Sequence, residues 1–144
     1  MLKLIYIFVA LLIQMNCRAD SESEKLVQSS WTNLVILHIP DDVSTLVPVS
    51  PSYLDEHYFT MVKINPYSGL SDSIRSWLKN AKFTEEAQSY QIRWRIRVED
   101  SSGNRVTIYM TSNGTSCYFN SRWYKNSDPN ISRILDKHFA CLEQ

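Results

Sequence analysis

Apolar and polar residues alternate most regularly between residues 91 and 111. Apolar residues take every second position of the first half, and charged residues fill the positions between them: Ile92, Trp94, Ile96 and Val98 against Arg93, Arg95, Arg97 and Glu99. This period of two predicts a β-strand with one face in the core and one face in water. A turn at 100–103, followed by renewed alternation at Val106, Ile108 and Met110, predicts an antiparallel return strand.

The tight turn at 100–103 also predicts the register of this hairpin. Residues that face each other across the two strands pair on the same side of the sheet. The expected pairs are Glu99 with Arg105, Arg97 with Thr107, Arg95 with Tyr109, Arg93 with Thr111 and, on the apolar side, Trp94 with Met110.

The residues before this hairpin predict a mixture of strands and helices. Apolar runs at 31–39 and 43–49 predict a first hairpin, and residues 58–64 predict a further strand. Ser50 and Pro51 are typical of a helix start and predict a short helix to Glu56. A second helix, capped by Ser71 or Asp72, is predicted through Ala81.

The residues after the hairpin predict a third strand and a final helix. Residues 117–124 are expected to form one strand, with Cys117, Phe119 and Trp123 on one side and Tyr118, Asn120, Arg122 and Tyr124 on the other. Asp128 and Pro129 open a helix that carries an apolar stripe to Leu142. The expected fold is α+β: an antiparallel β-sheet of about four to six strands, with two main α-helices packed on one face and one disulfide.

The N-terminal residues are typical of a targeting signal for export. Lys3 precedes the apolar run 4–13, and Cys17-Arg18-Ala19 closes the segment, so residues 1–19 are expected to be a signal peptide. The apolar run is too short for a membrane anchor, which needs about 20 residues. An acylated Cys17 is the alternative, although Gln14-Met15-Asn16 lacks the small and aliphatic residues expected there. Residues 20–28 are expected to be a flexible leader and residues 29–144 a single domain, secreted or periplasmic.

Composition and charge exclude several classes of function. The chain has 144 residues, 15 basic and 15 acidic residues, and three glycines, so a glycine-rich phosphate-binding loop is absent. Removing residues 1–19 leaves 13 basic and 15 acidic residues, which argues against general nucleic-acid binding. Cys117 and Cys141 remain, and an oxidising compartment favours a disulfide between them, although a reduced, catalytic Cys117 is the alternative.

Residues with the spacing of a catalytic or metal site are hard to find. His38, His57 and His138 have no metal-ligand spacing, and no serine lies in a nucleophile-elbow sequence, so neither a metal nor another cofactor is expected. Pairs of adjacent acids occur, but adjacent acids in turns usually serve as caps or solvated surface. The alternative is a small secreted phosphodiesterase or nuclease in which His57 acts as base, His138 as acid and the arginines hold a phosphate.

The most distinctive surface feature is a row of arginines interleaved with tyrosines. The residues expected on this surface are Arg93, Arg95, Arg97, Arg105, Tyr109 and Arg122. Arginine and tyrosine often dominate protein interfaces, so the hypothesis is a small exported, non-enzymatic binding or inhibitory module of the immunity-protein type. Another protein, preferably acidic, is the expected partner. A solvated sheet face, a phosphate or single-stranded nucleic-acid surface, and a permanent contact in an envelope assembly are the alternatives.

Overall fold

The computed structural model describes residues 24–40, 43, 49–85 and 91–141. The expected signal peptide at 1–19 and the first four residues of the expected leader lie outside this part of the chain. So does most of the strand expected at 43–49.

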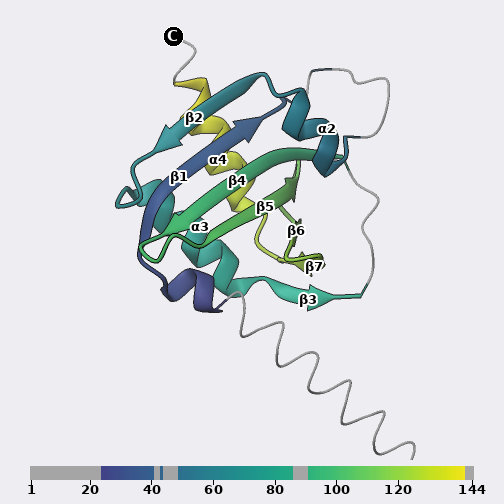
Figure 1. Ribbon diagram of the computed structural model, residues 1–144. Coiled ribbons are helices and arrows are strands. Elements are labelled where there is room, and N and C mark those ends of the chain that lie inside the picture. The colour runs from purple at the N-terminus through teal and green to yellow at the C-terminus, as the bar shows by residue number, and fades with distance from the viewer. Residues whose placement is uncertain (1–23, 41–42, 44–48, 86–90, 142–144) are drawn as a thin grey trace, which may run out of the picture.

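Among the described residues, seven strands form one antiparallel sheet (Figure 1). They lie in the spatial order β2-β1-β4-β5-β6-β7-β3. The strands are β1 (Trp31–His38), β2 (Thr60–Ile64), β3 (Lys82–Thr84), β4 (Ile92–Asp100), β5 (Arg105–Thr111), β6 (Ser116–Phe119) and β7 (Arg122–Lys125). The helices span residues 24–28, α2 (Pro51–Glu56), α3 (Gly69–Asn80) and α4 (Asn130–Ala140).

The mixed α+β class and the antiparallel sheet agree with expectation, but the expected count of four to six strands is wrong. Two features account for the difference. β3 has only three residues, too few to show an alternating pattern. The run at 117–124 is two strands, because Asn120 and Ser121 adopt positive φ angles of 48° and 60° and form a tight hairpin turn.

This hairpin turn also changes which residues share a face. Phe119 faces Arg122 and Cys117 faces Tyr124 across β6 and β7. Arg122 and Tyr124 therefore lie on the same side of the sheet as Cys117, and Trp123 lies on the side of Tyr118. The expected grouping of Trp123 with Cys117 is wrong for this reason.

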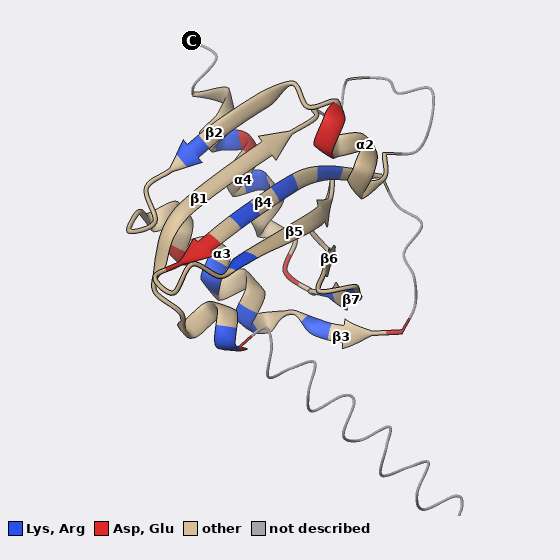
Figure 2. Cartoon of the chain, in the orientation of Figure 1, with Lys and Arg blue, Asp and Glu red and all other residues tan. Residues whose placement is uncertain are grey.

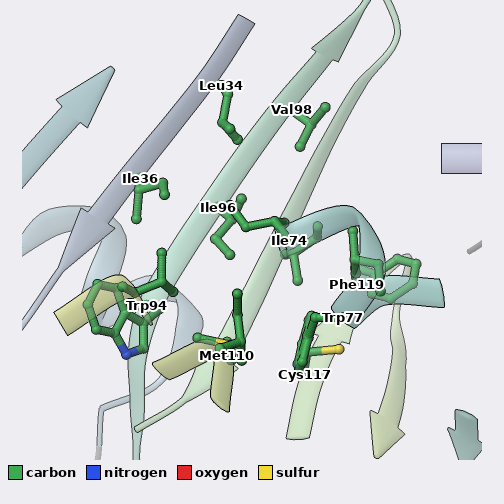
Figure 3. Close-up of a cluster of buried hydrophobic side chains, with 14 of the residues drawn as sticks. Leu34, Ile36, Ile74, Trp77, Trp94, Ile96, Val98, Met110, Cys117 and Phe119 are labelled. Carbon is green, nitrogen blue, oxygen red and sulfur yellow. The ribbon is translucent and has the colours of Figure 1, made fainter. Parts of the chain in front are cut away.

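The main core lies between one face of the sheet, here called the inner face, and helices α3 and α4, which lie behind the sheet in Figure 1. Figure 3 shows Trp94, Ile96 and Val98 of β4 pointing into this core, as the alternation predicts. The buried Trp77 of α3 donates its indole N–H to the carbonyl of Gly114 at 3.0 Å. This contact holds the helix layer to the turn between β5 and β6.

The expected disulfide between Cys117 and Cys141 is wrong, since both are free cysteines. Cys117 is fully buried in the main core (Figure 3), whereas Cys141 is exposed at the C-terminal end of α4. The first turn of α4 packs beside Gly114, three residues before Cys117. The 11 residues of α4 extend about 16 Å away from that point, and disulfide-bonded cysteines need Cα atoms within about 7 Å.

A second, smaller core lies on the opposite face of the sheet, here called the outer face. It contains Ile39, Val49, Leu54 and Ile92, so α2 covers one end of this face. Ile92 faces this side because β4 contains a bulge. Ile92 pairs with Thr111, whereas Trp94, two residues later, pairs with Met110, the residue directly before Thr111. The expected pair of Arg93 with Thr111 is therefore wrong, and Ile92 leaves the apolar phase of the main core.

Residues 24–28 form a short helix that packs on the domain. Leu26 is buried in the main core, and its carbonyl accepts a hydrogen bond from the indole N–H of Trp31 at 2.9 Å. The packed part of the chain thus begins before residue 29, the start expected from sequence.

Candidate functional site

The middle of the outer face is attached to α2 through one carboxylate. Arg95 of β4 forms an ion pair with Asp55, and Tyr109 of β5 donates its hydroxyl to the other oxygen of Asp55 at 2.9 Å. Burial and the bond to Asp55 raise the pKa of Tyr109 to about 12. Arg95 and Tyr109, two of the residues expected to bind a partner, are both bound to Asp55 of α2.

Arg93 holds a loop rather than presenting its guanidinium to solvent. The residue is only 4% exposed, and its Nη1 donates to the carbonyls of Pro40 and Val43 at 3.3 and 3.2 Å. Its Nη2 donates to the amide oxygen of Gln91. Charged donors with several backbone acceptors are typical of a structural role.

Arg122 lies outside the expected row because the β6–β7 turn places it on the inner side of the sheet. Its guanidinium lies 5.8 Å from the ring centroid of Phe83 on β3, a cation–π contact. Arg105 does lie on the outer face, and its Nε donates to Glu99 at 3.0 Å in an exposed ion pair. The six expected residues therefore do not form one continuous surface.

Arg97 and Lys63 form the open cationic part of the outer face. Both lie opposite Val35, Arg97 from β4 on one side and Lys63 from β2 on the other. Both are exposed, and neither forms an ion pair with a residue that the structure describes. Val35, between them, is only 8% exposed. Figure 2 shows the basic positions along β4 and on β2.

An exposed apolar segment lies next to Lys63. Tyr58, Phe59 and Met61, here called the apolar edge, are 43%, 65% and 59% exposed. Met61 lies two residues before Lys63 on β2, so both side chains are on the outer face. β2 is an edge strand of the sheet, with β1 as its neighbour. An apolar edge bordered by a cation is typical of a surface that binds another molecule.

The sequence contained a signal for this surface, although the hypothesis did not use it. Phe59, Met61 and Lys63 alternate with Thr60, Val62 and Ile64. Both sets are largely apolar, so the alternation alone does not tell which set faces the core.

The histidines do not assemble into one site. His38 is buried and stacks on Trp94 with ring centroids 3.6 Å apart. His57 ends α2 on the outer side of the sheet, whereas His138 belongs to α4 on the inner side. The acid and base of the nuclease alternative are thus on opposite sides of the sheet. Within the described residues, no group of three His, Cys, Asp or Glu side chains has the geometry of a metal site.

No protein-family model, no curated protein and no solved structure matches this chain. In the described ranges, no helix is both long enough and apolar enough to cross a membrane. The fold and the surface together define the molecule as a mixed α+β domain with an exposed apolar and cationic edge.

Proposed function

We propose that this protein is a small exported binding module that recognises, and by binding neutralises, another protein through the outer face of its sheet. The single observation that carries the proposal is that the apolar edge, Tyr58, Phe59 and Met61, leads into β2 beside Lys63, a cation that forms no ion pair with the residues the structure describes. Exposed apolar side chains bordered by charge supply both buried area and selectivity in protein interfaces.

The recognition surface differs from the one expected from sequence. Arg93, Arg95 and Tyr109 bind residues of the same chain, so they support the surface without contacting the partner. In this proposal, Arg97 and Lys63 are the cations that contact the partner, and Arg105 lies at the margin of the recognition surface. Asp55 fixes α2, the helix that precedes the apolar edge in the chain, to β4 and β5.

Charge indicates the nature of the partner. Two exposed cations flank Val35, and two acids near them, Asp55 and Glu99, are already paired. An acidic partner surface would pair with these cations and would associate faster at low salt. Export through residues 1–19 belongs to the same proposal and rests on their signal-peptide pattern.

The test is capture of a partner from the secreted or periplasmic fraction of the source, with the purified protein as bait. We expect one acidic protein to be retained by the wild type and lost with Arg97→Glu. The matched control is Lys79→Glu, which reverses an exposed cation in the last turn of α3, on the other side of the sheet. Capture that is equal in all three baits, or lost equally in both variants, would contradict the proposed surface.

A further inference from the structure

We infer that the partner contributes an extended, acidic segment that pairs with β2 as an eighth strand of the sheet. This inference rests on the proposed function and specifies how the partner binds. Strand addition supplies affinity through backbone hydrogen bonds and selectivity through alternate side chains.

The position of β2 in the sheet makes this mode possible. β2 pairs on one side with β1, from Leu34↔Ile64 to His38↔Thr60, and it has no strand on its other side among the described residues. Phe59 extends the pairing, since its N–H donates to the carbonyl of His38 at 3.0 Å. An edge strand of this kind presents outward N–H and C=O groups to an incoming strand. The opposite edge, β3, has only three residues.

The side chains of β2 determine which segment fits. Met61 and Lys63 lie on the outer face. Val62, which is half-buried, points to the inner side. Directly opposed residues on neighbouring strands have Cβ atoms about 5 Å apart. The added strand therefore needs an apolar residue opposite Met61 and a carboxylate opposite Lys63, two residues away and on the same face.

Arg97 adds a second positive charge to this side of the face. It lies two strands in from the edge, about 10 Å from β2 and about 14 Å from the added strand at the usual strand spacing, with Val35 between. Lys63 therefore contacts the acid of the added strand directly, and Arg97 attracts the acidic segment over a longer distance. The charges thus favour an acidic occupant over a neutral one.

The same charges argue against a second copy of this chain as the occupant. In a symmetric antiparallel pair of two β2 strands centred on Val62, Lys63 would face Met61 of the other copy. The two Lys63 side chains would then be diagonal neighbours about 7–8 Å apart on one face. Two like charges at that separation repel, and no acid on either edge strand compensates them.

The experiment uses a panel of nine-residue peptides that alternate glutamate or aspartate with valine, leucine, isoleucine or phenylalanine. Binding to the whole protein is measured by fluorescence anisotropy, and amide hydrogen exchange reports on residues 59–64. We expect at least one peptide to bind, to protect these amides, and to lose tenfold or more in affinity with Lys63→Glu but not with Lys79→Glu.

Backbone methylation separates strand addition from simple charge attraction. Peptides N-methylated at every second residue keep their charges but lose the hydrogen bonds along one edge. We expect one of the two methylation patterns to abolish binding and the other to preserve it. Equal binding of both patterns, or no peptide that protects residues 59–64, would overturn the inference.

Two further outcomes are distinguishable. If the peptides fail but capture of a partner still depends on Arg97, strand addition is wrong and the proposed function stands. If the protein alone shows concentration-dependent protection of residues 59–64, with dimers in sedimentation equilibrium, the occupant is a second copy and the inference is overturned.

Discussion

Tyr109 and Asp55 are 54 residues apart in sequence, yet the tyrosine hydroxyl donates to the Asp55 carboxylate at 2.9 Å. Arg95 binds the second oxygen of the same carboxylate. One aspartate on a six-residue helix thus holds two neighbouring strands to α2. Without these bonds, Leu54 and the small outer core would be the main anchor of α2 on the sheet.

The raised pKa of Tyr109 predicts a loss of stability at alkaline pH. The folded value is about 12, whereas an unfolded tyrosine titrates near 10. The contribution of this group is therefore complete below pH 10 and declines as the pH rises through 12, because only the unfolded state releases the proton easily. Urea unfolding at pH 8, 10 and 11.5 should show that the stability gap between wild type and Tyr109→Phe narrows over this range.

Replacing any tyrosine by phenylalanine removes one ionisable group, so a matched variant is needed. Tyr67 is 81% exposed in the turn after β2. Tyr67→Phe should stay parallel to the wild type at every pH. At pH 8, Tyr109→Phe should cost about 1 kcal/mol, the usual contribution of one such hydrogen bond. A constant gap across the pH range would argue against the Asp55 contact.

Substitutions of Arg93 and Arg97 are predicted to differ in their effect on stability, because Arg93 has a structural role and Arg97 is a binding residue in the proposed function. Arg93→Met leaves two backbone carbonyls without their charged donor and should reduce the free energy of unfolding by about 2 kcal/mol or more. Arg97→Met changes an exposed side chain and should stay within about 0.5 kcal/mol of the wild type. Chemical denaturation measures both values, and similar losses in the two variants would refute the division of roles.

The two free cysteines are predicted to differ sharply in reactivity. Burial raises the pKa of the Cys117 thiol far above its ordinary range, so thiolate does not form in the folded protein. In a Cys17→Ser chain, a thiol reagent should label one cysteine, Cys141, at once and the second only in denaturant. Dithiothreitol should leave the melting temperature unchanged. A drop in that temperature on reduction would indicate a disulfide after all.

Gly114 is predicted to be intolerant of any side chain. Its φ is +69°, and an added Cβ would lie 2.7 Å from Cγ2 of Ile131 on α4. Gly114→Ala should therefore cost about 1–3 kcal/mol, from backbone strain and from displacement of α4. Gly69→Ala, at the start of α3 with no atom within 4 Å, is the control and should be nearly neutral. Thermal unfolding of both variants is sufficient to compare them.

The sequence predicts the strands of the central hairpin well because their alternation is strict. The pairs Glu99 with Arg105 and Arg95 with Tyr109 are as expected, and so is the helix capped by Ser50. The start of α3 is less predictable: Ser68, not Ser71 or Asp72, is the N-cap. Several serines near this position could serve as the N-cap. Which of them does so depends on how the first turn of the helix packs against the rest of the domain.

The candidate site was less accessible from sequence than the fold. The two-residue period of apolar and charged positions shows that Arg93, Arg95 and Arg97 share a strand. It does not show that α2 covers part of that strand. The bulge beside Ile92 and the turn at Asn120 each add a local change of phase that no periodicity reveals. The exposure of Phe59 and Met61 depends in turn on β2 being at the edge, which is a property of topology.

The position of β4 beside β1 has a consequence for synthesis of the chain. β1 ends at His38, but its central partner begins at Ile92, so the sheet cannot close until the chain has been made through β4. Pairings this distant in sequence form slowly, because a long loop must be closed before any contact stabilises it. A growing chain with this topology stays open until β4 has been made, and if residues 1–19 direct export as proposed, a translocation channel would meet it in that open state.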